Sequence, residues 1–251
     1  MPYTIAVAGK GGTGKTTISG LIIYHLVKSG KTPVFAVDAD PNSNLDIIIG
    51  MKSETTAAEL REDVLSRNVP EGMTKTAFME LKLQECIEEG SGVDLLVMGR
   101  PEGPGCYCAV NNLLRTYLSN VSKNYRYMVM DNEAGMEHLS RRTTNDIDLL
   151  VIVTTPTFVG VRSALNVRNT AEQLKLKITK TVLVLNQAAK EPAGELLAEL
   201  KKHGMEPEGI IPADELLAGQ AEKGGDVFSV AGESKASSAV KELLLKTGAL
   251  K

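Results

Sequence analysis

Tryptophan is absent from this chain, and aromatic residues make up only 4% of its 251 positions. Proteins that bind single-stranded nucleic acid stack the bases on aromatic side chains, and domains that bind the phosphate backbone carry a marked excess of Lys and Arg. The formal net charge here is −3. The composition therefore argues against a nucleic-acid partner.

Long apolar runs are also lacking. Those present, such as Leu149–Val153, have the length of a strand, whereas a helix that crosses a membrane needs about 20 apolar residues. The opening segment Met1–Gly9 lacks the basic stretch, apolar core and cleavage site of a secretory signal. We therefore expect no membrane partner.

Cysteine is scarce as well, with Cys86, Cys106 and Cys108 the three in the chain. A low, odd number of cysteines without an export signal is typical of proteins of the reducing cytoplasm. A chain of this length does not need disulfides to hold its core. The sequence therefore predicts a cytoplasmic location.

What the chain does contain is an alternation of short β-rich runs with longer segments of helical periodicity. In one such segment, Ile18, Leu21, Ile22 and Leu26 recur at helical spacing. Continuous apolar strands that alternate with helices predict an α/β fold with a mostly parallel sheet and helices on both faces. No repeat or linker divides the sequence, so we expect residues 1–251 to form a single domain. Strands are expected at residues 3–8, 33–37, 94–98, 127–130, 149–154, 181–185 and 209–211, and helices at 16–28, 57–67, 75–89, 109–121, 160–174, 193–203 and 235–246.

The run Gly9-Lys10-Gly11-Gly12-Thr13-Gly14-Lys15-Thr16 fits the phosphate-loop pattern G-x-x-x-x-G-K-[ST] between an expected strand and an expected helix. In this setting backbone N–H groups cradle phosphate oxygens, and the helix directs its positive end toward them. Lys15 is expected to reach the β- and γ-phosphates of ATP, and Thr16 to ligate Mg²⁺. The alternative is a Gly-rich turn without a ligand. The expected nucleotide-binding positions are Gly11, Gly12, Thr13, Gly14, Lys15, Thr16 and Thr17.

Lys10 gives this loop a distinctive start. A loop that reads K-G-G-x-G-K-T-T resembles the deviant phosphate loop of the MinD/ParA/nitrogenase iron protein group. The resemblance implies that Lys10 crosses a dimer interface and touches the nucleotide of the partner subunit. A cation delivered in this way offsets charge on the transferred phosphoryl group. The alternative is an exposed loop lysine with no catalytic part.

Acidic residues follow two of the expected strands. Asp38 and Asp40 precede Pro41 and Asn42 after one strand, and the carboxyl ends of parallel strands lie beside the ligand crevice. In the resembled group an Asp before Pro belongs to switch I and positions the attacking water, which is the role implied for Asp40. Asp38 is expected to act on Mg²⁺ through water. The alternative for both is a turn or a helix cap.

Asp131 ends the apolar run Tyr127–Met130. An apolar strand that ends in Asp is the arrangement in which a carboxylate supports Mg²⁺. The stretch Asp131-Asn132-Glu133-Ala134-Gly135 resembles switch II. This resemblance implies that Gly135 is the hinge that responds to the γ-phosphate.

Two later segments are candidates for the base. Asn186 ends the apolar run Val182–Leu185, and Pro212 and Asp214 follow another run. In the resembled group an Asn at the first place contacts adenine, and an Asn amide has the donors and acceptor that an adenine edge requires. The resemblance places the loop of Pro212 and Asp214 nearby. The alternative for Asn186 is a turn-forming role.

The run Cys106-Tyr107-Cys108 lies after a segment rich in Gly and Pro. Two thiolates at i and i+2 converge on one soft metal but supply only half of a tetrahedral site. A two-fold axis would pair two copies into Cys₄, which predicts a site for Zn²⁺ or a comparable soft metal between the subunits of a homodimer. A redox pair and buried apolar side chains are the alternatives. Burial is favoured for Cys86, because Leu81 and Leu83 share its helical stripe.

Together, the phosphate loop, the segment Asp38–Asn42, the run Gly105–Cys108 and the stretch Asp131–Leu139 resemble the CooC/AcsF-type nickel-insertion ATPases. These proteins mature carbon monoxide dehydrogenase or acetyl-CoA synthase. The resemblance implies an ATP-dependent homodimer that holds nickel or zinc between its subunits and delivers it to such an enzyme. His138 is a further candidate ligand, with a capping role as the alternative.

Two other functions fit parts of the sequence. A reductase like nitrogenase iron protein holds a [4Fe–4S] cluster between its subunits, but its cluster ligands lie far apart in sequence rather than at i and i+2. A positioning ATPase binds membrane or DNA. The stretch Ser237–Lys251, with Val240, Leu243 and Leu244 on one side, is either a membrane contact of that kind or a helix packed on the sheet.

Overall fold

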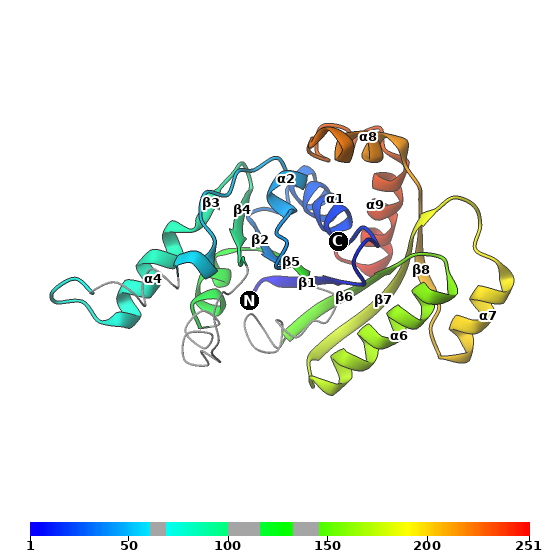
Figure 1. The fold of residues 1–251 in the computed structure, drawn as a ribbon, viewed down its shortest axis with the longest axis horizontal. Coiled ribbons are helices and arrows are strands. Elements are labelled where there is room, and N and C mark those ends of the chain that lie inside the picture. Colours follow the sequence, from blue (N-terminus) through cyan, green and yellow to red (C-terminus); the bar gives the residue numbers. More distant parts are fainter. Residues whose placement is uncertain (61–68, 100–115, 133–145) are drawn as a thin grey trace.

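The computed structural model describes residues 1–60, 69–99, 116–132 and 146–251. Within these residues eight strands form one sheet in the order β3-β4-β2-β5-β1-β6-β7-β8 (Figure 1). Every neighbouring pair is parallel except β3 with β4, which is antiparallel. The strands are β1 (Tyr3–Ala8), β2 (Val34–Ala39), β3 (Ile87–Glu89), β4 (Val93–Val97), β5 (Tyr127–Asn132), β6 (Asp146–Thr154), β7 (Lys177–Ala188) and β8 (Pro207–Pro212).

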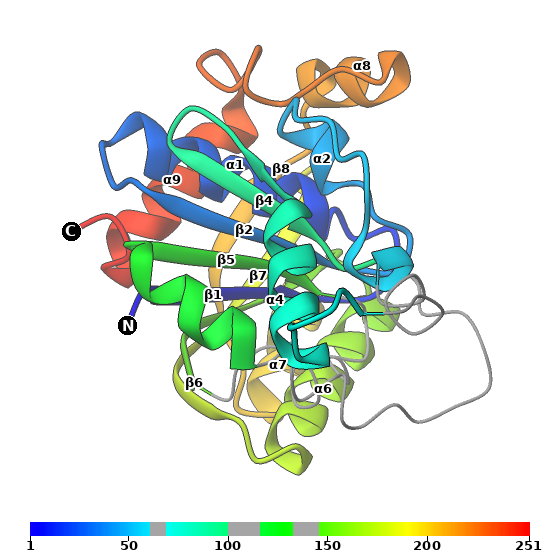
Figure 2. The ribbon, with the colours of Figure 1, turned by 90° about the vertical axis from the view of Figure 1, so that its left-hand side faces the viewer.

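Helices cover both faces of this sheet, as Figure 1 and Figure 2 show from two sides. Helices α1 and α9 pack on one face, whereas α4, α6 and α7 pack on the other. This arrangement confirms the predicted α/β class and the mostly parallel sheet. The helices are α1 (Lys15–Lys28), α2 (Leu45–Ile48), α4 (Lys75–Glu85), α6 (Phe158–Gln173), α7 (Gly194–Lys202), α8 (Glu215–Lys223) and α9 (Lys235–Thr247), with a 3₁₀ turn, η1, at Ser122–Asn124.

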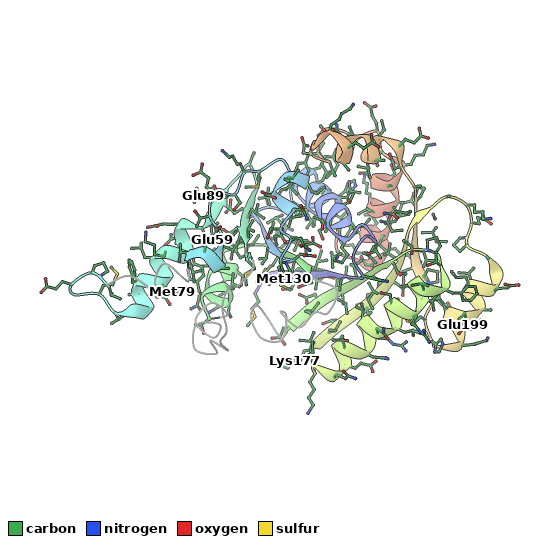
Figure 3. All side chains as sticks on the ribbon, viewed as in Figure 1. Glu59, Met79, Glu89, Met130, Lys177 and Glu199 are labelled. Atoms are coloured by element: carbon green, nitrogen blue, oxygen red, sulfur yellow. The ribbon has the colours of Figure 1, made fainter. Side chains whose placement is uncertain are left out.

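Alternate residues of the central strands supply the two cores, because neighbouring side chains of a strand point to opposite faces. In β5, Val129 packs in the core that holds α1, whereas Met130 packs in the core that holds α6. Figure 3 shows Met130 at the centre of the molecule and Glu199, on α7, at its outer edge. The side chains of Val129 and Met130 are both fully buried. The sheet is thus a rigid platform for the loops at its ends.

The apolar side of the last helix faces this platform. Val240 and Leu244 of α9 are fully buried and Leu243 is nearly so, all within the core shared with α1. Ser234 caps the helix by accepting from the backbone N–H of Ser237 at 2.9 Å. Of the two interpretations of this segment, packing on the sheet is therefore the one that the structure supports. No helix among the described residues is both long and apolar enough to cross a membrane.

One predicted helix is shorter than expected. The sequence predicts a helix over residues 75–89, but α4 ends at Glu85, and residues 87–89 form β3 instead. The reason is tertiary: Ile87 pairs with Leu96 across an antiparallel ladder, and Gly92 turns the chain between the strands with a φ of +84°. This strand pairing outweighs the local helix propensity of the glutamates, so residues 87–89 adopt a strand.

Several strands run further at their carboxyl ends than their apolar runs suggest. β5 includes Asp131 and Asn132, and β7 includes Asn186, so these side chains are held by the sheet rather than by loops. The short helices α2 and α8 were not predicted. Of two further predicted helices, only residues 57–60 and 116–121 are described, and both segments are helical.

Candidate nucleotide-binding site

The phosphate loop joins the end of β1 to the start of α1 at the carboxyl edge of the sheet. Inside the loop, the carbonyl of Lys10 accepts from the backbone N–H of Thr13 at 3.3 Å and from its hydroxyl at 2.8 Å. The first backbone bond of the helix follows at once, from the N–H of Ile18 to the carbonyl of Gly14 at 3.0 Å. The predicted strand–loop–helix setting of the motif is therefore present.

Two glycines in this loop are required by close contacts. A Cβ at Gly9 would lie 2.1 Å from the carbonyl oxygen of Val153 in the neighbouring strand. A Cβ at Gly14 would lie 2.4 Å from Nδ2 of Asn186, and Gly14 also has a φ of +83°. A side chain at either position would push the loop away from the sheet.

Lys15 and Asp40 meet at the centre of the site. Their side chains are 6% and 15% exposed, and the ammonium lies 3.7 Å from Oδ2 of the carboxylate. The other oxygen of Asp40 accepts from the backbone N–H and the side-chain amide of Asn42, each at 3.0 Å. The two residues predicted from the phosphate loop and from switch I are thus brought together.

Asp38 is fully buried and holds the loop that carries Asp40. One of its oxygens accepts from the N–H of Asp40 at 3.1 Å, and the other from the N–H of Leu45 at 2.9 Å, at the start of α2. Burial raises the pKa of Asp38 to about 6, although these two N–H groups lower it in part. Because both oxygens of Asp38 accept from backbone N–H groups, this side chain holds switch I in place. It is therefore less suited to act as a direct ligand of Mg²⁺.

Asp131 lies beside Asp38, since the two residues are register partners on β5 and β2. Its Oδ1 accepts from the hydroxyl of Ser19 at 3.1 Å, while its Oδ2 is buried without a hydrogen-bond partner among the described residues. Burial raises the pKa of Asp131 to about 7, the nearby Thr16 hydroxyl lowers it in part, and the charge of Asp38 raises it further.

This arrangement fits a divalent cation. A buried carboxylate oxygen with no partner, next to a second buried carboxylate and a threonine hydroxyl, is an all-oxygen donor set of the kind that Mg²⁺ takes near phosphates. A cation there would reduce the repulsion between Asp38 and Asp131, and it would give the unpaired oxygen of Asp131 a partner. The structure therefore supports Thr16 and Asp131 as the residues that would hold Mg²⁺.

Ser19 and Asn132 are site residues that sequence reasoning missed. Ser19 is fully buried in the middle of α1 and orients Asp131, and a polar residue on an otherwise apolar helix face was the available signal. The side-chain amide of Asn132 donates to the carbonyls of Val7 and Met130, each at 3.1 Å, and so ties β1 to β5 near the carboxyl ends of both strands.

A cavity of about 710 Å³ opens beside the phosphate loop and is large enough for a nucleoside. Gly14, Thr17, Asn186, Pro212 and Asp214 all line it, which brings the predicted base-binding residues together with the loop. Helix α8 also lines this cavity, through Leu217, Ala218 and Ala221.

Asn186 and Asp214 also have structural tasks in this pocket. The amide of Asn186 donates to the carbonyl of Thr13 at 2.8 Å, which fixes the loop against β7. Asp214 caps α8 and accepts from the hydroxyl of Ser234 and the N–H of Ala236. Partial burial works against the charge of Asp214, but these hydrogen bonds prevail and lower its pKa. Asp214 therefore shapes the pocket wall, and its contact with a base stays a prediction.

The predicted transition-metal site lies outside the described residues, since Cys106, Cys108 and the further candidate His138 fall in undescribed segments. Gly135, the predicted hinge of switch II, also lies there. The described residues contain no cluster of three or more His, Cys, Asp and Glu side chains that could hold such an ion. Cys86 is buried in the core, and burial raises the pKa of its thiol to about 11, which suits the predicted apolar role. Leu81, expected on the same stripe, is 46% exposed.

Comparisons with known proteins indicate the family of this chain. A family model described as an AAA domain matches residues 3–184. An uncharacterised ATP-binding protein of Methanocaldococcus jannaschii is 37% identical over 246 residues, covering 96% of this chain and 97% of its own length. The carbon monoxide dehydrogenase accessory protein CooC of Rhodospirillum rubrum is 35% identical over 187 residues, which cover 69% of this chain and 70% of that protein. The chain belongs to the MinD/ParA family of P-loop ATPases.

The fold of this MinD/ParA member is shared by a solved structure. The septum site-determining protein MinD of Pyrococcus horikoshii, in complex with Mg-ADP, superposes with a TM-score of 0.70 at 19% identity over 98% of this chain and 96% of that one. ATPases of the MinD/ParA type are commonly dimeric. The chain is accordingly an ATP-binding P-loop protein, and the cavity beside its phosphate loop is the candidate site for the nucleotide.

Proposed function

We propose that this chain is an ATP-dependent metallochaperone. Mg-ATP closes a homodimer, hydrolysis reopens it, and this cycle controls a nickel ion held between the subunits for delivery to a carbon monoxide dehydrogenase or acetyl-CoA synthase enzyme. The observation that carries the proposal is the pair Cys106 and Cys108 in a chain 35% identical to a carbon monoxide dehydrogenase accessory protein. The pair supplies two soft ligands per subunit, and two subunits complete four.

The nucleotide half of the proposal rests on the central pair of the site. Lys15 lies 3.7 Å from Asp40, and a triphosphate would attract the same ammonium. When Lys15 turns to the phosphates, Oδ2 of Asp40 is released to accept a proton from the attacking water, while Asn42 keeps the carboxylate in place through Oδ1. Mg²⁺, when bound by Thr16 and Asp131, would shield charge on the β- and γ-phosphate oxygens.

Lys10 provides the link between hydrolysis and dimer closure. Its side chain is exposed at the edge of the site, where it can reach the nucleotide of a second subunit. The closed dimer is then the state in which each γ-phosphate meets a lysine from both subunits. ATP drives closure because it binds this state more tightly than the open one, and loss of the γ-phosphate removes that preference.

Metal stoichiometry tests the proposal most directly. Anaerobically purified protein would be loaded with Ni²⁺ or Zn²⁺, and bound metal per chain would be recorded together with molar mass from light scattering. We expect one metal ion per two chains in the wild type and none in the Cys106→Ser/Cys108→Ser variant. No thiol-dependent metal in the wild type would remove the metallochaperone function and leave an ATPase.

Cys86→Ala is the matched control for this experiment. It removes a thiol of the same chain, but Cys86 is only 1% exposed within the core, so metal binding should stay at the wild-type level. Protein that is brown as purified and contains iron and sulfide would instead favour an iron–sulfur reductase.

A positioning ATPase is the second candidate function, because the fold of this chain superposes on a septum site-determining MinD. Such a protein would co-sediment with anionic vesicles or DNA only when ATP is present. We expect no co-sedimentation, because the apolar side of α9 is buried. ATP-dependent co-sedimentation of both wild type and the double Cys variant would favour this candidate.

A further inference from the structure

A second cavity, of about 420 Å³, lies at the end of α2 and shares no lining residue with the nucleotide pocket. Three separate segments form its walls: the chain that follows α2, the turn between β3 and β4, and the loop between α8 and α9. Its volume lies within the range of ligand-binding pockets, about 300–1,000 Å³. We refer to it as the α2 cavity, and its lining residues include Ile49, Met51, Lys52, Glu88, Glu89 and Phe228.

The side of the α2 cavity that faces the core is apolar. Ile49 and Val93 are each 5% exposed, and Met51 and Phe228 are half-buried side chains that pack against the core shared with α1. The ring of Phe228 is supported by Tyr24 of α1, whose ring centroid lies 5.4 Å away at an angle of 71°. The cavity is thus a preformed apolar hollow into which an apolar side chain of a partner would fit.

The outer border of the α2 cavity is acidic. Glu88 of β3 is the register partner of Leu95, so its side chain lies on the face of the sheet that packs against α1. Its Oε1 accepts from the backbone N–H of Glu54 at 3.2 Å, and within the described residues Glu88 makes no further hydrogen bond or ion pair. Glu89 is exposed at the outer edge of the sheet (Figure 3). Lys52 is the one basic side chain among the described residues that line the cavity.

Helix α2 connects the α2 cavity with switch I. At the start of the helix, the N–H of Leu45 donates to the buried carboxylate of Asp38 at 2.9 Å, and the wall of the cavity begins where the helix ends. At that end, the carbonyl of Ile48 accepts from the N–H of Val227 at 2.9 Å. A Cβ at Gly20 of α1 would lie 2.5 Å from Cγ2 of Ile48, so α2 packs closely on α1. A displacement of switch I would therefore move one wall of the cavity, while the wall formed by β4 stays with the sheet.

We propose that the α2 cavity is a docking site for a partner polypeptide that presents an apolar side chain next to a lysine or arginine, and that the affinity for this partner depends on the bound nucleotide through switch I. The apolar side chain enters the hollow, and the cation pairs with the carboxylates of Glu88 and Glu89. This inference goes beyond the proposed function, because it requires neither the transition metal nor the dimer.

The charge of the border decides the kind of partner. Glu88 and Glu89 would repel an anionic lipid surface or a nucleic acid. A second copy of this chain docked through the same face would bring two acidic borders together, because a two-fold contact uses the same patch on both subunits. A polypeptide is favoured over a small molecule, since one wall is the exposed turn at residues 89–91, past which an extended chain can continue.

Amide NMR spectra of the full chain with Mg-ADP test the site, with hexapeptides Gly-Ser-X-Z-Ser-Gly as probes, in which X is Leu or Phe and Z is Arg or Glu. We expect the Arg peptides to shift the amide signals of Met51 and Gly90, and the Glu peptides to leave them unchanged. Glu88→Gln keeps the oxygen that accepts from Glu54 but loses the charge, so it should weaken binding of the Arg peptides about fivefold. Glu195→Gln removes an exposed carboxylate from α7 and, as the matched control, should bind like wild type. Unchanged affinity for ADP shows that both variants are folded.

The dependence on nucleotide is measured by repeating the titration with a non-hydrolysable ATP analogue in place of ADP. We expect the affinity for the Arg peptides to differ about fivefold or more between the two nucleotides. By reciprocity, the peptide should change the relative affinity for the two nucleotides by the same factor. Equal peptide affinities would overturn the link through α2.

The docking site itself is overturned if no peptide shifts the two amide signals at millimolar concentration, if Arg and Glu peptides bind equally, or if Glu88→Gln binds like wild type. Shifts of the same size with agmatine, which carries a guanidinium group without a peptide chain, would assign the cavity to small cations and overturn the choice of a polypeptide. If the protein binds no thiol-dependent metal but binds the Arg peptides as expected, the proposed function fails while this inference stands.

Discussion

At the scale of single residues, the carboxylate of Asp131 combines features that rarely occur together in a stable core. One of its oxygens is held by Ser19, whereas the other is buried without a partner among the described residues. An unsatisfied buried acceptor costs about 1–3 kcal/mol of stability. Such a group is kept where a ligand satisfies it, which is why the residue is informative about Mg²⁺.

Replacement of Asp131 by Asn should make the ligand-free protein more stable at high pH. The pKa of Asp131 is raised to about 7 in the folded chain, so between about pH 4 and pH 7 the folded state keeps a proton that the unfolded state has released. Stability of the wild type therefore falls as pH rises through this interval and stays low above it. At pH 8 without Mg²⁺, Asp131→Asn should exceed wild type by roughly 1–3 kcal/mol in urea unfolding.

The same variant should lose the response to ligand. Mg-ADP should raise the unfolding temperature of wild type more at pH 8 than at pH 6, because the cation competes with the proton on Asp131. Asp131→Asn should show a much smaller Mg²⁺-dependent increase at both values. An equal Mg²⁺ response in the two proteins would mean that the carboxylate does not support the cation.

Gly14→Ala should impair nucleotide binding through backbone geometry alone. Gly14 has a φ of +83°, and a Cβ there would lie 2.4 Å from Asn186, so alanine brings both strain and a clash. We expect a loss of about 1–3 kcal/mol in stability and a weaker affinity for fluorescent ADP. Gly11→Ala is the control for stability, since nothing lies within 4 Å of its Cβ. Equal stability of the two variants would contradict the geometry.

At the scale of elements, the pocket wall depends on how α8 is attached to the rest of the fold. None of the residues of α8 is buried. The helix is instead held at its start, where Asp214 accepts from Leu216 and Leu217 within α8 and from Ser234 and Ala236 at the start of α9. One carboxylate thus serves as a cap and as a tether between two helices.

Substitutions at Asp214 can separate these two tasks. Asp214→Ala removes both and should cost about 1–2 kcal/mol of stability together with weaker nucleotide binding. Asp214→Asn keeps a capping oxygen but replaces the other with a donor, so amide hydrogen exchange should accelerate at Ala236 while Leu216 stays protected. Unchanged exchange at Ala236 in the Asp214→Asn variant would show that the hydrogen bond from Ala236 to Asp214 does not stabilise the contact between α8 and α9.

Elements also show what the sequence could and could not predict. The phosphate loop, Asp40 and the loop of Pro212 and Asp214 were predictable, because each follows an apolar strand. The carboxyl ends of parallel strands meet at one edge of the sheet. β3 was not predictable, because Glu88 and Glu89 have no strand preference of their own and pair only through the turn at Gly92. The short helix α8 was not predictable either, because none of its residues is buried and it has no buried apolar stripe.

At the scale of the whole molecule, the action of Lys10 across a dimer can be tested by mixing two inactive proteins. Lys10→Ala and Asp40→Asn should each abolish hydrolysis while ADP binding remains. In a mixed dimer, the subunit with Lys10→Ala keeps Asp40 and receives Lys10 of the partner subunit, so one site works. Random pairing of equal amounts should restore about one quarter of wild-type ATPase activity. No recovery would place Lys10 in its own subunit's site.

The span of the nucleotide pocket has a consequence for how the chain is made. The pocket is lined by Gly14 near one end of the sequence and by Lys235 and Ala236 near the other. During synthesis the phosphate loop leaves the ribosome well before α9, but the lining of this pocket is complete only after α9 has emerged and packed on α1. Domains fold largely as units as they emerge, so an unfinished chain would carry a phosphate loop without a closed pocket. Tight nucleotide binding therefore marks a nascent chain in which α9 has already been translated and has packed.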